Sequence, residues 1–177
     1  MSFFDSNRRF WVTRGNATPD ICSWYNVSSL TNTTVEFELG TGWNNKEQQC
    51  RSVQLTYYFG ENDKMFKVSE VVGFGYFYHM VYSDVYCAVV KGVEWDQTND
   101  MKSKKCEETD GDLNPFPTEP CCYANNTEKL RTSPMASWIG KLPERNYCSR
   151  FSNAIYVTDR NNVPKDCTEK YDKLKKA

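Results

Sequence analysis

Eight cysteines within 177 residues constrain this chain more than any other feature of its sequence. They accompany four N-glycosylation sequons, at Asn16, Asn26, Asn32 and Asn125. Disulfides persist in oxidising compartments, and the Asn-x-Ser/Thr sequon is modified only in the secretory pathway. We therefore expect a secreted, extracellular glycoprotein in which every cysteine is oxidised. The eight cysteines are Cys22, Cys50, Cys87, Cys106, Cys121, Cys122, Cys148 and Cys167.

The N-terminus and the charge limit the surroundings in which the chain is expected to act. The opening residues, MSFFDSNRRF, carry charges where a secretory signal has its apolar core, so we expect a mature chain whose Met1 is not the natural start. No stretch approaches the roughly 18 apolar residues of a membrane span. The formal net charge of −1 gives no strong field toward nucleic acid or an anionic membrane. We expect a soluble monomer that binds neither.

The first two-thirds of the chain has the pattern of consecutive antiparallel strands. Residues 33–39 alternate strictly, with Val35, Phe37 and Leu39 on one face and polar side chains on the other. Strict alternation is typical of a sheet with one wet face, and no helix long enough for a crossover separates the strands. The pattern predicts a meander that is closed into a barrel or folded as a sandwich. The predicted strands are 10–13, 22–27, 33–39, 51–59, 65–72, 75–82 and 85–93.

The pattern changes after Trp95. Residues 96–120 are polar and contain three prolines, which predicts an irregular loop with at most one edge strand. A helix is predicted over 134–142, because Pro134 suits its first position and apolar residues recur at helical spacing. Those apolar residues are Met135, Trp138, Ile139 and Leu142. We predict one domain over 1–177: the barrel at about 8–120, the helix and C-terminal segment at about 121–167, and a frayed tail at 168–177.

The cysteine spacing favours disulfides over a metal site. The chain has no Cys-x-x-Cys motif, and His79 is its only histidine, so a zinc site lacks a ligand set. The pairing of eight cysteines does not follow from sequence alone. Adjacent Cys121 and Cys122 cannot easily bond to each other. We expect each to pair elsewhere and to tie the predicted helix to the barrel.

Four segments share an order and spacing that cover most of the chain. They are FWVTRGNATPDIC (10–22), YSDVYCAVVKG (82–92), the Cys121-Cys122 pair before a helix, and IYVTDRNNVPKDC (155–167). This arrangement resembles the tick salivary lipocalins. The resemblance implies an all-β fold, an eight-stranded antiparallel lipocalin-like barrel with a C-terminal α-helix, stapled by disulfides. It also implies a non-enzymatic protein of tick saliva that sequesters a small mediator or binds a host protein, such as a complement component.

The resemblance further implies how the cysteines pair. Cys87 would bond to one of the vicinal cysteines, Cys121 or Cys122. Cys22 would bond to a C-terminal cysteine, Cys148 or Cys167. Cys50 and Cys106 have no place in the minimal framework of the family, and an extra bridge between the two is one option that this leaves open.

The amine-binding signature of that family is incomplete in this sequence. Cys87 is followed by Ala88 where the family has Asp, and the nearest match to Glu-Leu-Trp is Glu94-Trp95. A buried ammonium group needs an opposite charge. Glu70, which lies among valines, is the best candidate for an inward acid. We therefore expect no tight binding of histamine or serotonin.

The sequence contains no complete catalytic motif. His79 lies in an aromatic strand, and no Gly-x-Ser-x-Gly elbow is present. Glu36 and Glu38 share a strand face that is expected to meet solvent, which is a poor placement for a two-carboxylate hydrolase. We expect a non-enzyme that holds no metal and no cofactor.

Two candidate binding regions follow from this pattern. Glu70, Tyr76, Tyr78 and Tyr82 are candidates to line a barrel cavity for a hydrophobic or amine ligand, unless aromatic side chains fill it. Glu107 and Glu108, in the loop 96–120, are candidates for a surface that binds a host protein.

The main hypothesis is a suppressor of host defence that binds a host protein through its outer surface. The alternative is a scavenger of a small inflammatory mediator, and an adhesive or structural β-sandwich is a third interpretation. An open cavity with a buried acid would favour the scavenger, whereas a filled barrel would favour the external partner.

Overall fold

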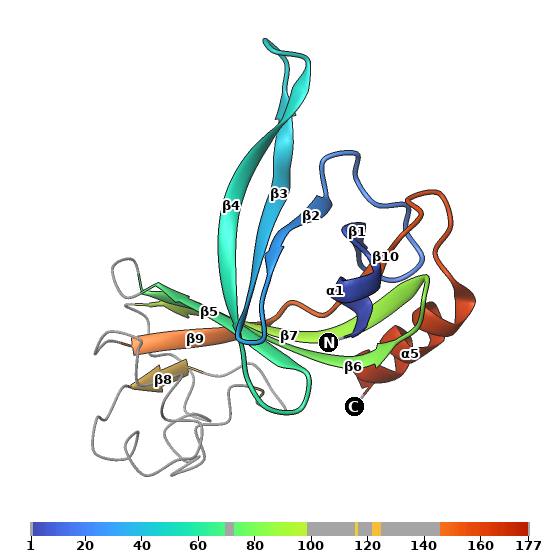
Figure 1. The fold of residues 1–177 in the computed structure, drawn as a ribbon. Helices are drawn as coiled ribbons and strands as arrows, with labels where there is room; N and C mark the ends of the chain where they lie inside the picture. The colour runs from blue at the N-terminus through green and yellow to red at the C-terminus, as the bar shows by residue number, and fades with distance from the viewer. Residues whose placement is uncertain (1, 70–72, 99–115, 117–121, 125–145, 177) are drawn as a thin grey trace. The chain divides into compact units, whose positions relative to one another are not determined.

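A computed structural model describes residues 2–69, 73–98, 116, 122–124 and 146–176 (Figure 1). These residues form short helices at both ends of the chain and strands between them. The helices are α1 (Ser2–Ser6) and α5 (Lys165–Lys176). The strands are β1 (Arg9–Thr13), β2 (Trp24–Leu30), β3 (Thr34–Asn44), β4 (Gln49–Phe59), β5 (Lys64–Ser69), β6 (Phe74–Ser83), β7 (Cys87–Gln97), β8 (Cys122–Ala124), β9 (Asn146–Phe151) and β10 (Ala154–Val157).

The strands belong to one sheet that closes on itself. Its order is β10-β1-β2-β3-β4-β5-β6-β7-β9-β8, and β10 also pairs with β7. In β10, Val157 lies opposite Trp11 of β1 and opposite Cys87 of β7, both in antiparallel register. Strands β1 to β7 and β10 therefore form a closed eight-stranded antiparallel barrel. With the C-terminal helix and the disulfides, this confirms the predicted fold class.

The described residues fall into two compact units. The first comprises those of Met1–Met65, His79–Lys91 and Asn153–Ala177. The second comprises those of Phe66–Tyr78 and Gly92–Ser152. The expectation of one domain over 1–177 stays a prediction.

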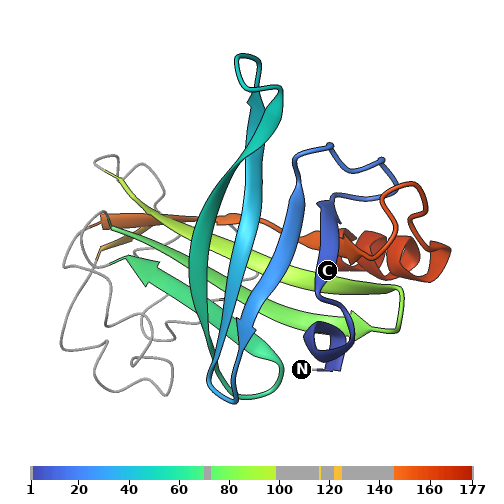
Figure 2. The ribbon, with the colours of Figure 1, turned by 45° about the horizontal axis from the view of Figure 1, so that its top comes forward.

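Aromatic side chains fill the core of the first unit. Phe3 and Phe4 of α1 are fully buried, as are Phe10 of β1 and Phe37 of β3. Ring centroids lie 5.3 Å apart for Phe4 and Phe37 and 4.8 Å apart for Phe10 and Tyr156. Helix α1 contacts β2 and directly precedes β1 (Figure 2). It thus adds two aromatic rings to a cluster whose other rings come from the inward-facing residues of the strands. This helix was not predicted from the sequence.

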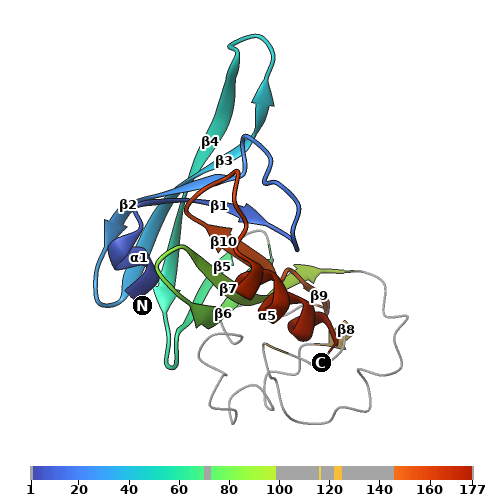
Figure 3. The same cartoon turned by 90° about the vertical axis from the view of Figure 1, so that its right-hand side faces the viewer.

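Helix α5 packs on the strands that close the sheet. The helix lies against β10 (Figure 3). Its Cys167 and Tyr171 are buried and pack with Cys87, Val89, Ile155 and Val157. The prediction of a frayed tail at 168–177 is wrong for the described residues 168–176. Helix α5 begins directly after Pro164. Its residues Cys167, Tyr171 and Leu174 follow the i, i+4, i+7 spacing of one helix face. That short stripe gives the helix an apolar surface to bury.

The hairpin of β3 and β4 is longer than predicted. Residues Gly40–Asn44 belong to β3, and the turn lies at 45–48 rather than beginning at Gly40. Strand β2 begins at Trp24, so this end of the hairpin projects beyond it (Figure 1). Gly42 takes a φ of 125°, which an L side chain rarely adopts, at an irregularity in the register between Gly40 and Trp43.

The barrel also ends elsewhere than predicted. Strand β7 continues to Gln97, and the strand that closes the ring is β10, not a segment of the loop 96–120. The barrel boundary at about residue 120 is therefore wrong. The predicted helix over 134–142 lies outside the described residues.

Candidate functional site

Two disulfides are described with both partners. Cys22 bonds to Cys50 and Cys87 bonds to Cys167, across 28 and 80 residues. Cys148 is disulfide-bonded as well. Cys106, Cys121 and the side chain of Cys122 lie outside the description.

The pairing implied by the family resemblance is therefore wrong for Cys22 and Cys87, and Cys50 does not pair with Cys106. Cys22 reaches Cys50 across β3 because Gly40 has no side chain there: a Cβ atom at Gly40 would overlap the carbonyl oxygen of Cys22. Cys87 reaches Cys167 because the apolar face of α5 places Cys167 against the start of β7.

The described sequons lie in two kinds of place. Asn16 and Asn32 are exposed, in the turns that follow β1 and β2. Asn26 is half-buried within β2, where its Nδ2 donates a hydrogen bond of 3.4 Å to Oε2 of Glu38. Asn125 lies outside the described residues.

The described candidate cavity residues lie in different surroundings. Tyr76 stacks with Tyr78, at 6.5 Å between ring centroids, and also contacts Phe74. Tyr82 packs instead with the α5 cluster, and its hydroxyl donates to Asp84 Oδ2 over 3.2 Å. Glu70, Glu107 and Glu108 lie outside the described residues. Their predicted roles stay predictions.

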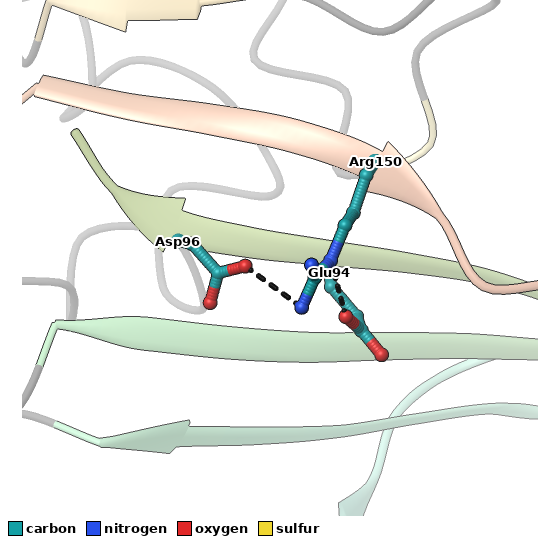
Figure 4. A network of polar contacts seen from close by, with 3 residues as sticks. All are labelled: Glu94, Asp96 and Arg150. Carbon is teal, nitrogen blue, oxygen red and sulfur yellow. Dashed lines mark hydrogen bonds and ion pairs between the residues drawn. The ribbon is translucent and has the colours of Figure 1, made fainter. Parts of the chain in front are cut away.

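A polar network in the second unit joins Glu94, Asp96 and Arg150 (Figure 4). Arg150 of β9 donates from Nε to Glu94 Oε2 over 2.6 Å, and its Nη2 lies 3.1 Å from Asp96 Oδ2. Glu94 and Asp96 alternate with Val93 and Trp95, which pack into the apolar cluster of this unit. The register places Arg150 directly opposite Glu94.

The electrostatics of this network follow from burial and charge. The side chain of Glu94 is 17% exposed and that of Arg150 is 67% exposed. Partial burial raises the pKa of the Tyr76 phenol, and the negative charges of Glu94 and Asp96 raise it further, against the opposing effect of Arg150. The hydrogen bond to Glu94 raises the pKa of the Arg150 guanidinium.

The network already contains its cation. Glu94, which the sequence singled out as part of a broken amine signature, is paired with Arg150 rather than facing an empty site. An entering ammonium group would have to displace this guanidinium or bind to the remaining charge on Asp96. Arg150 was not predicted from the sequence as a site residue, because its strand, β9, was not predicted either.

The face of β7 that carries Glu94 and Asp96 also includes Gly92, and side chains pack directly on the backbone there. A Cβ atom at Gly92 would lie 2.5 Å from Oγ of Ser152 and 2.8 Å from the Tyr78 ring. The Ser152 Oγ is buried and has no hydrogen-bond partner among the described residues. The Tyr78 ring and the Ser152 hydroxyl therefore pack directly over the Gly92 backbone and leave no room there for a side chain.

A second group of possible ligands lies where α5 meets β7. Oxygen and sulfur atoms of Asp84, Cys87 and Cys167 lie within 4.8 Å of one another. Both cysteines are consumed by a disulfide, so they offer no thiolate to a metal. Asp84 instead accepts hydrogen bonds from the N–H groups of Tyr86 and Cys87, over 2.7 and 2.8 Å, and holds the turn between β6 and β7.

No family model, curated protein or solved structure matches this chain. Among the described residues, no helix is long and apolar enough to cross a membrane. The structure shows the class of fold, which is a closed antiparallel β-barrel with disulfides and a C-terminal helix.

Proposed function

We propose that this protein is a secreted, non-enzymatic binding protein that engages another extracellular protein through its outer surface. The observation that carries the proposal is the aromatic core of the first unit. Phe3, Phe4, Phe10 and Phe37 fill space that a barrel with a small-molecule pocket would keep open. Such aromatic packing favours an external partner over a ligand in this part of the barrel.

The polar network of the second unit supports the same choice. A site for a biogenic amine needs a buried carboxylate without its own counter-ion. Glu94 is the most buried acid of the network, and it is already paired with Arg150 at 2.6 Å. This arrangement is typical of a structural ion pair more than of an amine site.

Exposed apolar side chains on rigid turns offer contact points for a partner. Val85 and Tyr86, at the turn between β6 and β7, are each 67% exposed. The turn is held by Asp84, and the Tyr86 carbonyl accepts hydrogen bonds from the N–H and hydroxyl of Thr158, over 2.9 and 3.1 Å. A turn held by hydrogen bonds has less conformational freedom to lose on binding, and tyrosine is enriched in protein interfaces.

The resemblance to tick salivary lipocalins gives the proposal its target class. Under it, the partner is a host defence protein of plasma, such as a complement component, and the protein acts in saliva. The competing function is sequestration of a small mediator, an amine or a lipid, in the barrel.

Surface plasmon resonance with purified complement components, together with calorimetry against histamine, serotonin and eicosanoids, tests the proposal. We expect a complex with a plasma protein and no submicromolar binding of the small ligands. Tyr86→Ser should weaken the complex at least tenfold, whereas Tyr58→Ser, at an exposed tyrosine of β4, should not. Tight one-to-one binding of a small mediator, with no protein complex, would replace this function by the competing one.

A further inference from the structure

The outer face of β1 and β2 carries two tryptophans and an arginine. Trp11 lies opposite Trp24, and Arg9 lies opposite Asn26. The intervening Phe10 and Tyr25 stack on each other in the aromatic core, so the alternating residues face the other side of the sheet. The Arg9 guanidinium lies 5.3 Å from the Trp11 ring and 5.4 Å from the Trp24 ring.

Asn26 is part of this face. It belongs to the sequon Asn26-Val27-Ser28, and Trp24 precedes it by two residues in the same strand. Residues i and i+2 of a strand point to the same side, with their Cα atoms about 7 Å apart. The first sugar of an N-linked glycan on Asn26 therefore starts within reach of the Trp24 ring and of the exposed Arg9.

We infer that Asn26 carries an N-linked glycan whose first sugars pack on Trp24 and Arg9. The apolar C–H face of N-acetylglucosamine complements an indole ring, which offers a large, flat apolar surface. The Arg9 guanidinium and the Glu38 carboxylate, which already accepts from Asn26, offer hydrogen bonds to the sugar hydroxyl and acetamide groups. The glycan thus covers half-buried aromatic surface that would otherwise meet water.

Asn32 offers a matched contrast. It is exposed in the turn after β2, and the residue two positions before it is Leu30 rather than an aromatic residue. A glycan on Asn32 has no tryptophan at this spacing. Asn32 is therefore the control for Asn26: a glycan on Asn32 should extend into solvent, whereas a glycan on Asn26 should pack on the protein.

The test uses the full chain behind a secretory leader in a eukaryotic host that adds N-glycans. Mass spectrometry should find Asn26 occupied, and Asn26→Gln should lower the melting temperature by about 2–4 °C, the shift expected for one moderate interaction in a domain of this size. Asn32→Gln should leave the melting temperature within about 1 °C of its starting value. The glycan is removed by mutation rather than by an amidase, because the enzyme would convert Asn26 to an aspartate beside Glu38.

A double-mutant comparison assigns the effect to the tryptophan. In a Trp24→Leu background, Asn26→Gln should no longer change the melting temperature, because the packing surface is gone. The ring current of Trp24 should also shift the proton resonances of the first sugar upfield in the wild type and not in Trp24→Leu. An unoccupied Asn26, or a glycan whose removal has the same effect with and without Trp24, would overturn the inference. The inference rests on the secretion that the proposed function includes, but neither readout depends on a protein partner, so its failure is distinguishable from a failure of partner binding.

Discussion

Gly40 of β3 lies directly against the backbone carbonyl of Cys22, the residue whose sulfur bonds to Cys50 on the next strand. Even a methyl group at position 40 would overlap that oxygen and approach the Trp24 indole nitrogen at 2.9 Å. We expect Gly40→Ala to destabilise the protein by about 1–3 kcal/mol, the usual cost of overpacking. Urea unfolding measures this, with the exposed neighbour Thr41→Ala as the control. Equal unfolding midpoints for the two variants would contradict the close approach.

The two described disulfides should contribute unequally to stability. In the chain-entropy account, the stabilisation grows as 1.5RT times the logarithm of the loop length, and the loops span 28 and 80 residues. The longer loop should therefore contribute about 1 kcal/mol more, within a total of about 2–5 kcal/mol for either bridge. Paired Cys→Ser variants at 22 with 50 and at 87 with 167, unfolded in urea, measure the difference. A larger loss from the first pair would contradict the ranking.

Removing one ring from the aromatic core should be costly. Phe4 is completely buried and contacts Phe10, Phe37 and Tyr156. Phe4→Ala should lower the free energy of unfolding by about 3–5 kcal/mol through the cavity it leaves. Asp5→Ala, at the exposed neighbouring position, should change it by no more than about 0.5 kcal/mol. A mild effect of Phe4→Ala would show that α1 does not fill the core in solution.

The single histidine makes a pH prediction easy to isolate. Partial burial lowers the pKa of His79, and the positive charges of Lys64 and Lys91 lower it further, against Asp63. Because its pKa is lower in the folded chain than the unfolded value of about 6.5, His79 adds stability above that pH. This contribution is lost as the pH falls through the folded pKa. The one imidazole NMR signal should titrate below pH 6.5, and a midpoint above this value would contradict the prediction.

The sequence predicts the central strands of this protein better than the elements near its two termini. Val35 and Phe37 alternate with Glu36 and Glu38 because one face of β3 packs on the core, and this periodicity is visible in the chain itself. The closing strand β10 is short and follows a long irregular segment, so nothing local marks it as the partner of β1. Helix α1 spans five residues, too few for a periodic pattern to appear.

Pairings between distant residues are harder to predict still. The bond between Cys87 and Cys167 depends on how α5 docks, and the Glu94–Arg150 pair depends on the register of β7 with β9. Neither relation leaves a mark in the neighbouring sequence. The family resemblance predicted the barrel correctly but implied the wrong partners for Cys22 and Cys87, because a shared order of cysteines does not determine which of them meet.

The position of β10 also bears on how the chain is made. A ribosome releases β1 and β7 long before Ala154–Val157, the segment that pairs with both of them. Until that segment emerges, the nascent protein exposes two unsatisfied backbone edges that can recruit strands from other chains. We therefore predict that a chain ending at residue 153 aggregates, measured by light scattering, whereas one ending after residue 176 stays monodisperse. Equal scattering from both would show that the barrel does not need its last strand to protect the first.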